Sequence, residues 1–144
     1  MGGLGEYRFS TPQAVALSGA PDKSIRNWKA RGVLDIGRKH FLGLWLFSPL
    51  DIVRLSAMQA LVSDVALAPA DAARVADFVV QRAADLTTLP GTLFLVRDDA
   101  GEWQAAWSMG GVPLAVQHRP HVAVPVLDII RGALARIAAA DGAP

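Results

Sequence analysis

Two neighbouring segments near the start of the chain place their apolar residues at helical spacing. In residues 11–18 the helix formers follow Pro12, whose missing N–H costs nothing in a first turn, and Ser10 or Thr11 can cap the segment. Gly19 can adopt a positive φ angle and end the helix. The pattern therefore predicts a short helix followed at once by a tight turn.

A second helix is predicted to begin after Pro21, with Asp22 near its positive N-terminal dipole. Ile25 and Trp28 are three residues apart, so they share a face that should point inward. Another face carries two cations and an amide, the groups that contact phosphates and base edges. Its members are Lys23, Arg26, Asn27 and Ala30.

Residues 36–47 predict a hairpin, because Gly37 and Gly43 are turn or bulge residues and aromatic and aliphatic residues dominate around them. Three basic residues fall near its tip: Arg38, Lys39 and His40. Such a hairpin would form a wing beside the helix pair.

The start of a third helix is marked by Ser48 as the cap, Pro49 in the first turn and Asp51 at the acidic third position. Its predicted buried stripe repeats at helical spacing and contains Ile52, Leu55, Met58 and Leu61 or Val62. The order helix, turn, helix, hairpin and helix is that of a winged helix-turn-helix.

Several motifs in register resemble one known family. They are Ile25-Arg26-Asn27-Trp28, Arg31-Gly32-Val33-Leu34, Gly43-Leu-Trp-Leu-Phe-Ser48 and Asp51-Ile-Val-Arg-Leu55. Over roughly residues 8–80 the chain resembles the N-terminal domain of the MerR family of transcription regulators. The resemblance implies double-stranded DNA as the partner.

The resemblance also implies roles for particular residues. Arg26, Arg38 and Lys39 inherit DNA contacts. Two positions depart from the family pattern: Trp45 stands where the family usually has a wing arginine, and Asn27 where it usually has an aromatic. Trp45 would then either pack inside the domain or stack on a sugar.

Side chains of the helix pair and wing that suit phosphates or base edges form the candidate DNA-binding set. They are Thr11, Lys23, Ser24, Arg26, Asn27, Lys29, Arg31, Arg38, Lys39 and His40. The charge distribution supports the placement of the DNA-binding surface in the first half of the chain. Residues 1–63 have 8 Lys/Arg and 4 Asp/Glu, whereas residues 64–144 have 6 Arg and 9 Asp/Glu. This asymmetry indicates a nucleic-acid surface in the first half only.

The second half predicts an α+β arrangement. A helix over residues 69–84 is followed by strands at 92–97 and 102–108, joined by the turn 98–101, then by a short strand at 112–116, an edge strand at 122–126 and a helix at 127–140. We expect three parts: a winged helix-turn-helix domain at 8–65, a connecting helix at 66–90, and a small α+β dimerisation or regulatory domain at 91–140.

The last predicted helix has two interpretations. Its apolar positions Leu127, Ile130, Leu134 and Ile137 are spaced 3, 4 and 3. They either close the core of the small sheet domain or form the seam of a homodimer, because coiled-coil contacts use this spacing. Two heads related by a two-fold axis would read an inverted repeat.

Enzyme and metal chemistry find little support. The chain has no cysteine, which excludes disulfides and the cysteine-based sensing of several MerR branches. His118 and His121 are interpreted as surface residues rather than metal ligands, and no nucleotide, zinc-protease or acyl-enzyme motif is present. Trp103 and Trp107 lie four residues apart on one strand and so share a face. They are interpreted either as core aromatics that face the terminal helix or as the floor of a ligand pocket.

These patterns predict a cytoplasmic protein, without a secretory signal, a membrane span or a cofactor. The leading interpretation is a sequence-specific transcription regulator, not an enzyme. Whether it senses a small-molecule effector is left open. One alternative is a phage or mobile-element DNA-handling protein, such as a small DNA-packaging subunit or an excision factor. Another is a protein-binding adaptor.

Overall fold

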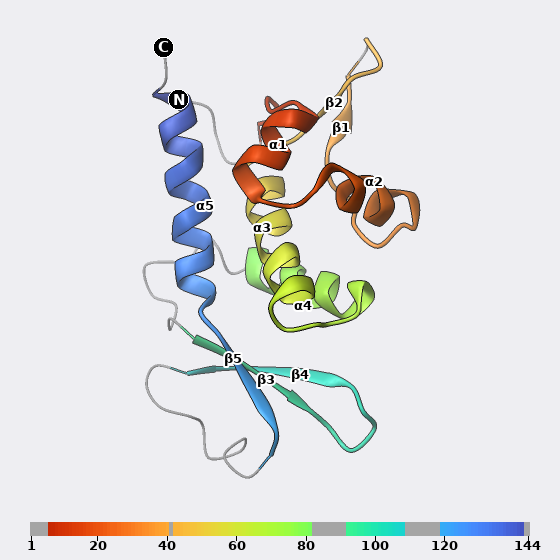
Figure 1. Ribbon diagram of the computed structural model, residues 1–144, viewed down its shortest axis with the longest axis vertical. Helices are drawn as coiled ribbons and strands as arrows, with labels where there is room; N and C mark the ends of the chain where they lie inside the picture. The colour runs from red at the N-terminus through yellow and green to blue at the C-terminus, as the bar shows by residue number, and fades with distance from the viewer. Residues whose placement is uncertain (1–5, 41, 82–91, 109–118, 143–144) are drawn as a thin grey trace.

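The computed structural model describes residues 6–40, 42–81, 92–108 and 119–142, and its mixed architecture confirms the predicted α+β class. In this part of the chain five helices accompany a two-stranded and a three-stranded antiparallel sheet. Figure 1 shows a helical head with a projecting hairpin, a separate sheet, and the long helix α5 running from the sheet along the head.

Local signals build the helix pair as predicted. Helix α1 (Thr11–Ser18) begins with a capping box in which the N–H of Gln13 donates to Ser10 Oγ and the N–H of Ser10 donates to Gln13 Oε1. Gly19 ends the helix at a φ of 77°, which glycine adopts without strain. Helix α2 (Asp22–Ala30) follows, with Ile25 and Trp28 buried.

The wing is a hairpin of β1 (Arg38–Lys39) and β2 (Trp45–Leu46), in which Lys39 is paired with Trp45. The N–H of His40 donates to the carbonyl of Leu44 at 2.6 Å, and the N–H of Gly43 donates to the carbonyl of His40 at 2.8 Å. Gly43 has a φ of 80°, as expected for the glycine of a three-residue hairpin loop. The predicted hairpin is confirmed.

Helix α3 (Pro49–Ser63) begins with the predicted capping box of Ser48 and Asp51. The Asp51 carboxylate does more than cap the helix. Its Oδ2 accepts hydrogen bonds from the N–H of Ser48 and from the N–H of Gly37, both at 3.0 Å. One buried carboxylate thus joins the start of α3 to the base of the wing.

The second half contains α4 (Pro69–Gln81), β3 (Thr92–Arg97), β4 (Trp103–Ser108), β5 (His121–Val124) and α5 (Val126–Asp141). The sheet order is β4-β3-β5, so the predicted hairpin of β3 and β4 is confirmed and β5 lies at an edge. The predicted strand at 122–126 needs a correction: it ends at Val124, and Pro125 is the N-cap of α5, where no N–H is required. The predicted strand at 112–116 lies outside the described residues.

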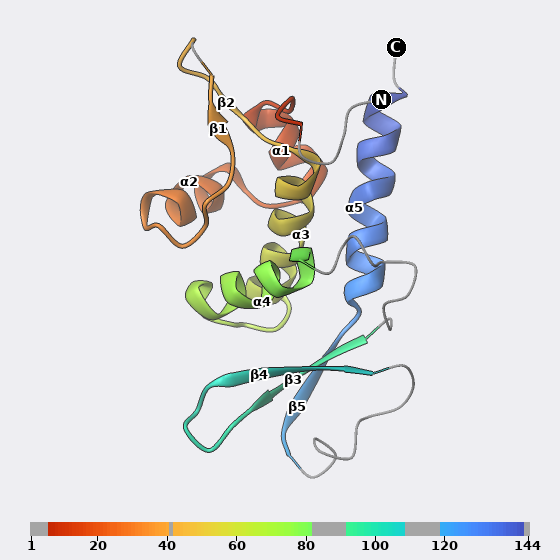
Figure 2. The ribbon, with the colours of Figure 1, turned by 180° about the vertical axis from the view of Figure 1, so that it is seen from behind.

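A single hydrophobic cluster connects the two halves. Ile52 of α3, Leu93 of β3 and Ile130 of α5 all belong to it and are fully buried. Helix α5 packs mainly against α3, with smaller contacts to α1 and β3, and Figures 1 and 2 show it beside the head from both sides. The three parts proposed with boundaries at residues 65 and 90 therefore share one hydrophobic core.

The terminal helix is predicted either to close the core or to form a dimer seam. For its buried positions, this packing favours closing the core. Ile130 and Ile137 are 0% and 5% exposed within a single chain, so they seal the chain's own core and are not available to the predicted dimer seam. Leu134 is half-buried against the same cluster, and Leu127 is also half-buried. The core that α5 closes includes the head as well as the sheet.

Polar contacts hold α5 to the N-terminal segment. Arg136 Nε donates to the carbonyl of Leu17 at 2.7 Å, and Arg8 forms a two-pronged ion pair with Asp141. The hydrogen bonds from Arg8 lower the pKa of the Asp141 carboxyl below its ordinary 3.8. Because the folded pKa is the lower one, the stabilisation by this pair is complete above the ordinary value and is lost in more acidic solution.

Ile130→Ala should destabilise both halves together, because it opens a cavity in a core that they share. We expect a loss of about 2–5 kcal/mol of unfolding free energy, measured by urea denaturation followed by circular dichroism. The neighbouring exposed change Arg131→Ala is the control and should stay within about 0.5 kcal/mol of the unmodified chain. Two separate transitions in the Ile130 variant, with the head unaffected, would contradict a shared core.

Candidate nucleic-acid interface

Helix α2 presents a cationic face because its apolar face is fixed from behind. Ile25 and Trp28 are 1% and 4% exposed and hold the helix against the core. Lys23, Arg26 and Asn27 lie on the exposed side. Arg26 is paired with Asp22 one turn earlier, with Nε 3.0 Å from Oδ2, but both side chains are largely solvated. Such a surface pair is weak, so the guanidinium is free to exchange it for a phosphate or a base.

Lys29 lies on the flank of α2 that faces the wing. Its Nζ is 2.9 Å from the centroid of the Trp45 ring and 5.3 Å from that of Phe47, a cation–π arrangement that joins α2 to β2. Burial lowers the pKa of the Lys29 ammonium from its ordinary 10.5, against the opposing attraction of the Asp51 and Asp35 carboxylates. The ammonium is therefore held in place rather than extended into solvent.

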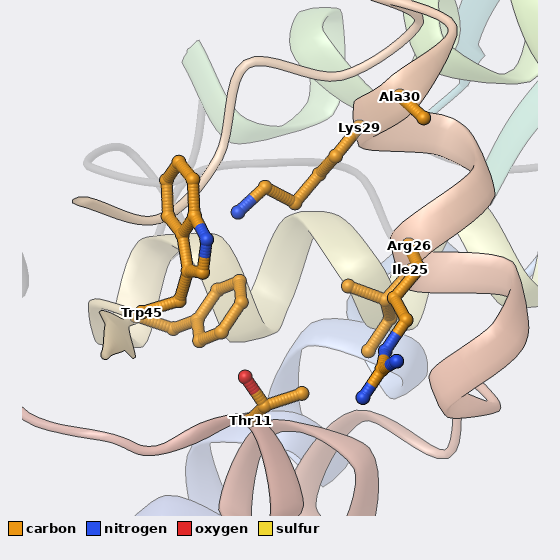
Figure 3. A pocket seen from close by; sticks show the side chains of 7 residues that line it. Thr11, Ile25, Arg26, Lys29, Ala30 and Trp45 are labelled. Atoms are coloured by element: carbon orange, nitrogen blue, oxygen red, sulfur yellow. The ribbon is translucent and has the colours of Figure 1, made fainter. Parts of the chain in front are cut away.

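A cavity of about 490 Å³ lies between α1, α2 and β2. Figure 3 shows Thr11, Arg26, Lys29 and Trp45 directing their side chains toward this common space. Ile25, Ala30 and Phe47 complete its lining. A hydroxyl, a guanidinium and an ammonium around an aromatic wall can bind a phosphate and pack against its sugar.

The wing adds two exposed cations, Arg38 and Lys39, beside α2. The Arg38 guanidinium lies 4.5 Å from the centroid of the Tyr7 ring, which steadies it at the base of the hairpin. Both views show α2 and the wing on the side of the head away from α5 (Figures 1 and 2). We call the exposed residues of α2 and of the hairpin the α2–wing surface.

The predicted DNA-binding residues divide by exposure. The exposed members are Lys23, Arg26, Asn27, Arg31, Arg38 and Lys39; the half-buried members are Thr11, Ser24, Lys29 and His40. Of these, the structure brings Thr11, Arg26 and Lys29 together around one cavity. Arg31 is the C-cap of α2, at the end of the helix farthest from Asp22. Their contacts with DNA stay predictions.

The structure also adds residues that the sequence interpretation missed. Tyr7 lies outside any periodic segment, so nothing in the sequence indicated its contact with Arg38. Trp45 neither packs inside nor stands free: it is 41% exposed and carries Lys29 over its ring. Leu42 and Leu44, which flank Gly43, are even more exposed, and their place beside a turn glycine was the available signal.

The second half offers less chemistry. Trp103 is half-buried and lines a cavity of about 210 Å³ with Val75 and Phe78 of α4, and the Arg97 guanidinium lies 5.0 Å from its ring centroid. Of the two interpretations, this position favours a pocket wall beside α4 over a contact with the terminal helix. The side chain of Trp107 is not among the side chains that the structure describes. His121 Nδ1 is 2.8 Å from the carbonyl of Arg119, and His118 lies outside the described residues. No group of three potential metal ligands occurs in the described part of the chain.

Comparison with known proteins agrees with this geometry. Residues 9–78, just under half of the chain, match the family described as MerR HTH family regulatory protein. The match extends from Phe9, whose backbone pairs with Phe47 at the end of the wing, to Phe78 in α4. A search of curated proteins found no match. Among the described helices, none is long and apolar enough to cross a membrane.

The position of Lys29 over Trp45 predicts a specific magnetic signature. Ring currents should shift the ε-proton signals of Lys29 upfield, and Trp45→Ala should return them to ordinary values. A pH titration of the same signals should give a midpoint below 10.5 in the unmodified protein, because burial disfavours the ammonium. Leu44→Ala, at the neighbouring exposed position, is the control and should leave the shifts unchanged. Ordinary Lys29 shifts before any substitution would show that the contact does not form in solution.

Proposed function

Because residues 9–78 match the MerR HTH regulatory family, we propose that this protein is a sequence-specific, double-stranded DNA-binding transcription regulator. The observation that carries the proposal is the α2–wing surface. It concentrates exposed cations on a helix that two buried side chains brace from behind. Between residues 20 and 50 the chain has six Lys or Arg and two Asp, which suits a phosphate backbone.

The shape of the surface supports one orientation on the duplex. An α-helix fits the major groove, and Arg26 and Asn27 on the exposed face of α2 are suited to base edges. With α2 so placed, the wing beside it reaches the phosphates or the adjacent minor groove. Thr11 and Lys29, at the cavity between helix and wing, would hold the backbone in between.

We also propose that the protein acts as a homodimer on an inverted repeat. One α2 reads a single half-site, and the modest charge of the head favours two heads acting together. The dimer contact excludes Ile130 and Ile137, since both are buried in the chain's own core. With no cysteine in the sequence, a regulatory signal would reach this protein by chemistry other than thiolate metal binding.

Selection of bound fragments from genomic DNA tests the function, and Arg26→Ala tests the orientation. Loss of this contact should weaken binding to a selected fragment by about 1–3 kcal/mol, measured by fluorescence anisotropy. Arg131→Ala removes the same charge from α5, on the far side of the head, and should bind normally. Unchanged affinity in the Arg26 variant would reject the assigned groove orientation. Sedimentation of the complex gives the number of chains bound.

The wing should contribute salt-dependent affinity. Replacing Arg38 and Lys39 together with alanine removes about two phosphate contacts, so the plot of log K against log salt should flatten by roughly 1.8. The substitutions are exposed and should leave the fold intact, which circular dichroism verifies. An unchanged slope would mean that these strand residues do not touch the phosphates.

A further inference from the structure

The exposed large apolar side chains of the described residues gather in the wing. Leu42 is 68% exposed, Leu44 is 62% exposed and Trp45 is 41% exposed. Trp45 already has Lys29 over its ring. The two leucines lie in the segment between β1 and β2, the hairpin that projects from the head (Figures 1 and 2). A single exposed leucine is ordinary. Two within three residues of each other on a projecting hairpin form a candidate contact surface.

Two backbone hydrogen bonds join the described residues on either side of the turn. Hydrogen bonds from Gly43 N–H to the carbonyl of His40 and from His40 N–H to the carbonyl of Leu44 close the loop. Gly43 lies between the leucines, and a Cβ there would meet no atom within 4 Å. These hydrogen bonds hold the backbones of His40, Gly43 and Leu44 together, and the bare glycine leaves room for a partner to approach closely.

The charge around the tip indicates the kind of partner. Arg38 and Lys39 are exposed on the strand that leads to the turn, and residues 36–50 contain no Asp or Glu. A purely apolar partner would gain nothing from these cations. The partner should be a polyanion with an apolar interior that a narrow projection can reach. The minor groove of duplex DNA has phosphate walls and stacked bases that can be partly separated by apolar side chains.

We propose that Leu42 and Leu44 form a wedge that enters the minor groove and opens a base step, bending the DNA. The proposal rests on the proposed function and extends it, because it assigns the wing tip to deformation rather than to backbone contact alone. Arg38 and Lys39 then bind the phosphates that flank the opened step. Wedges of this kind bend the duplex by about 20–90°. Selectivity would extend to flexible pyrimidine–purine steps beyond those read by α2.

The test measures the bend of a selected DNA fragment, labelled at both ends, by energy transfer at saturating protein. The unmodified protein should bring the ends closer, and the double variant Leu42→Ala/Leu44→Ala should bind with most of that bend lost. Its salt slope should be unchanged, because the phosphate contacts remain. The matched variant Arg38→Ala/Lys39→Ala should show the reverse: weaker, less salt-dependent binding with the bend kept once the fragment is saturated.

The outcomes separate the wedge from the proposed function. An equal bend in the leucine variant, or no bend with the unmodified protein, overturns the wedge and leaves DNA binding standing. No binding of any genomic fragment overturns both. If the leucine variant bends DNA normally but loses self-association in sedimentation, the tip contacts a second copy of the chain and the wedge is overturned. Exposed substitutions of this kind should not unfold the protein, and circular dichroism of both variants confirms this.

Discussion

The α2–wing surface depends on one buried carboxylate. Asp51 accepts the N–H groups of both Ser48 and Gly37, so the first turn of α3 and the base of the hairpin share a single acceptor. Without it, two N–H groups would be left without this partner, at a cost of about 1–3 kcal/mol each where they are buried. Because Gly37 is the last residue before β1, fixing its position sets the direction in which the wing leaves the head.

Gly37 is constrained from a second side. Its φ is 75°, and a Cβ at this position would lie 3.0 Å from the ring of Phe47. Phe47 is fully buried and pairs its backbone with Phe9, which leads into α1. The base of the wing is thus held by a carboxylate, an aromatic ring and a short backbone bridge. The tip, by contrast, projects beyond the packed part of the head (Figure 1).

The elements that the sequence predicts are those with local signals. Ser10, Gly19 and the Ser48–Asp51 pair mark helix ends through contacts within a few residues, and the structure forms all of them. The exposed face of α2 is predictable for the same reason. The contact of Lys29 with Trp45 is not, because it joins two elements whose approach depends on the whole head. Periodicity likewise identified the apolar face of α5 without indicating that it would meet α3.

The packing of α5 on α3 affects where the chain can be truncated. The family match ends at residue 78. Helix α3 lies inside the match, but helix α5, which packs on α3, lies beyond it. A fragment ending after α4 would leave the apolar side of α3 that faces α5 in water and would lose the hydrogen bond that Arg136 makes to α1. The matched segment therefore ends before the helix that completes its hydrophobic core, and in this chain that helix comes from the last 20 residues.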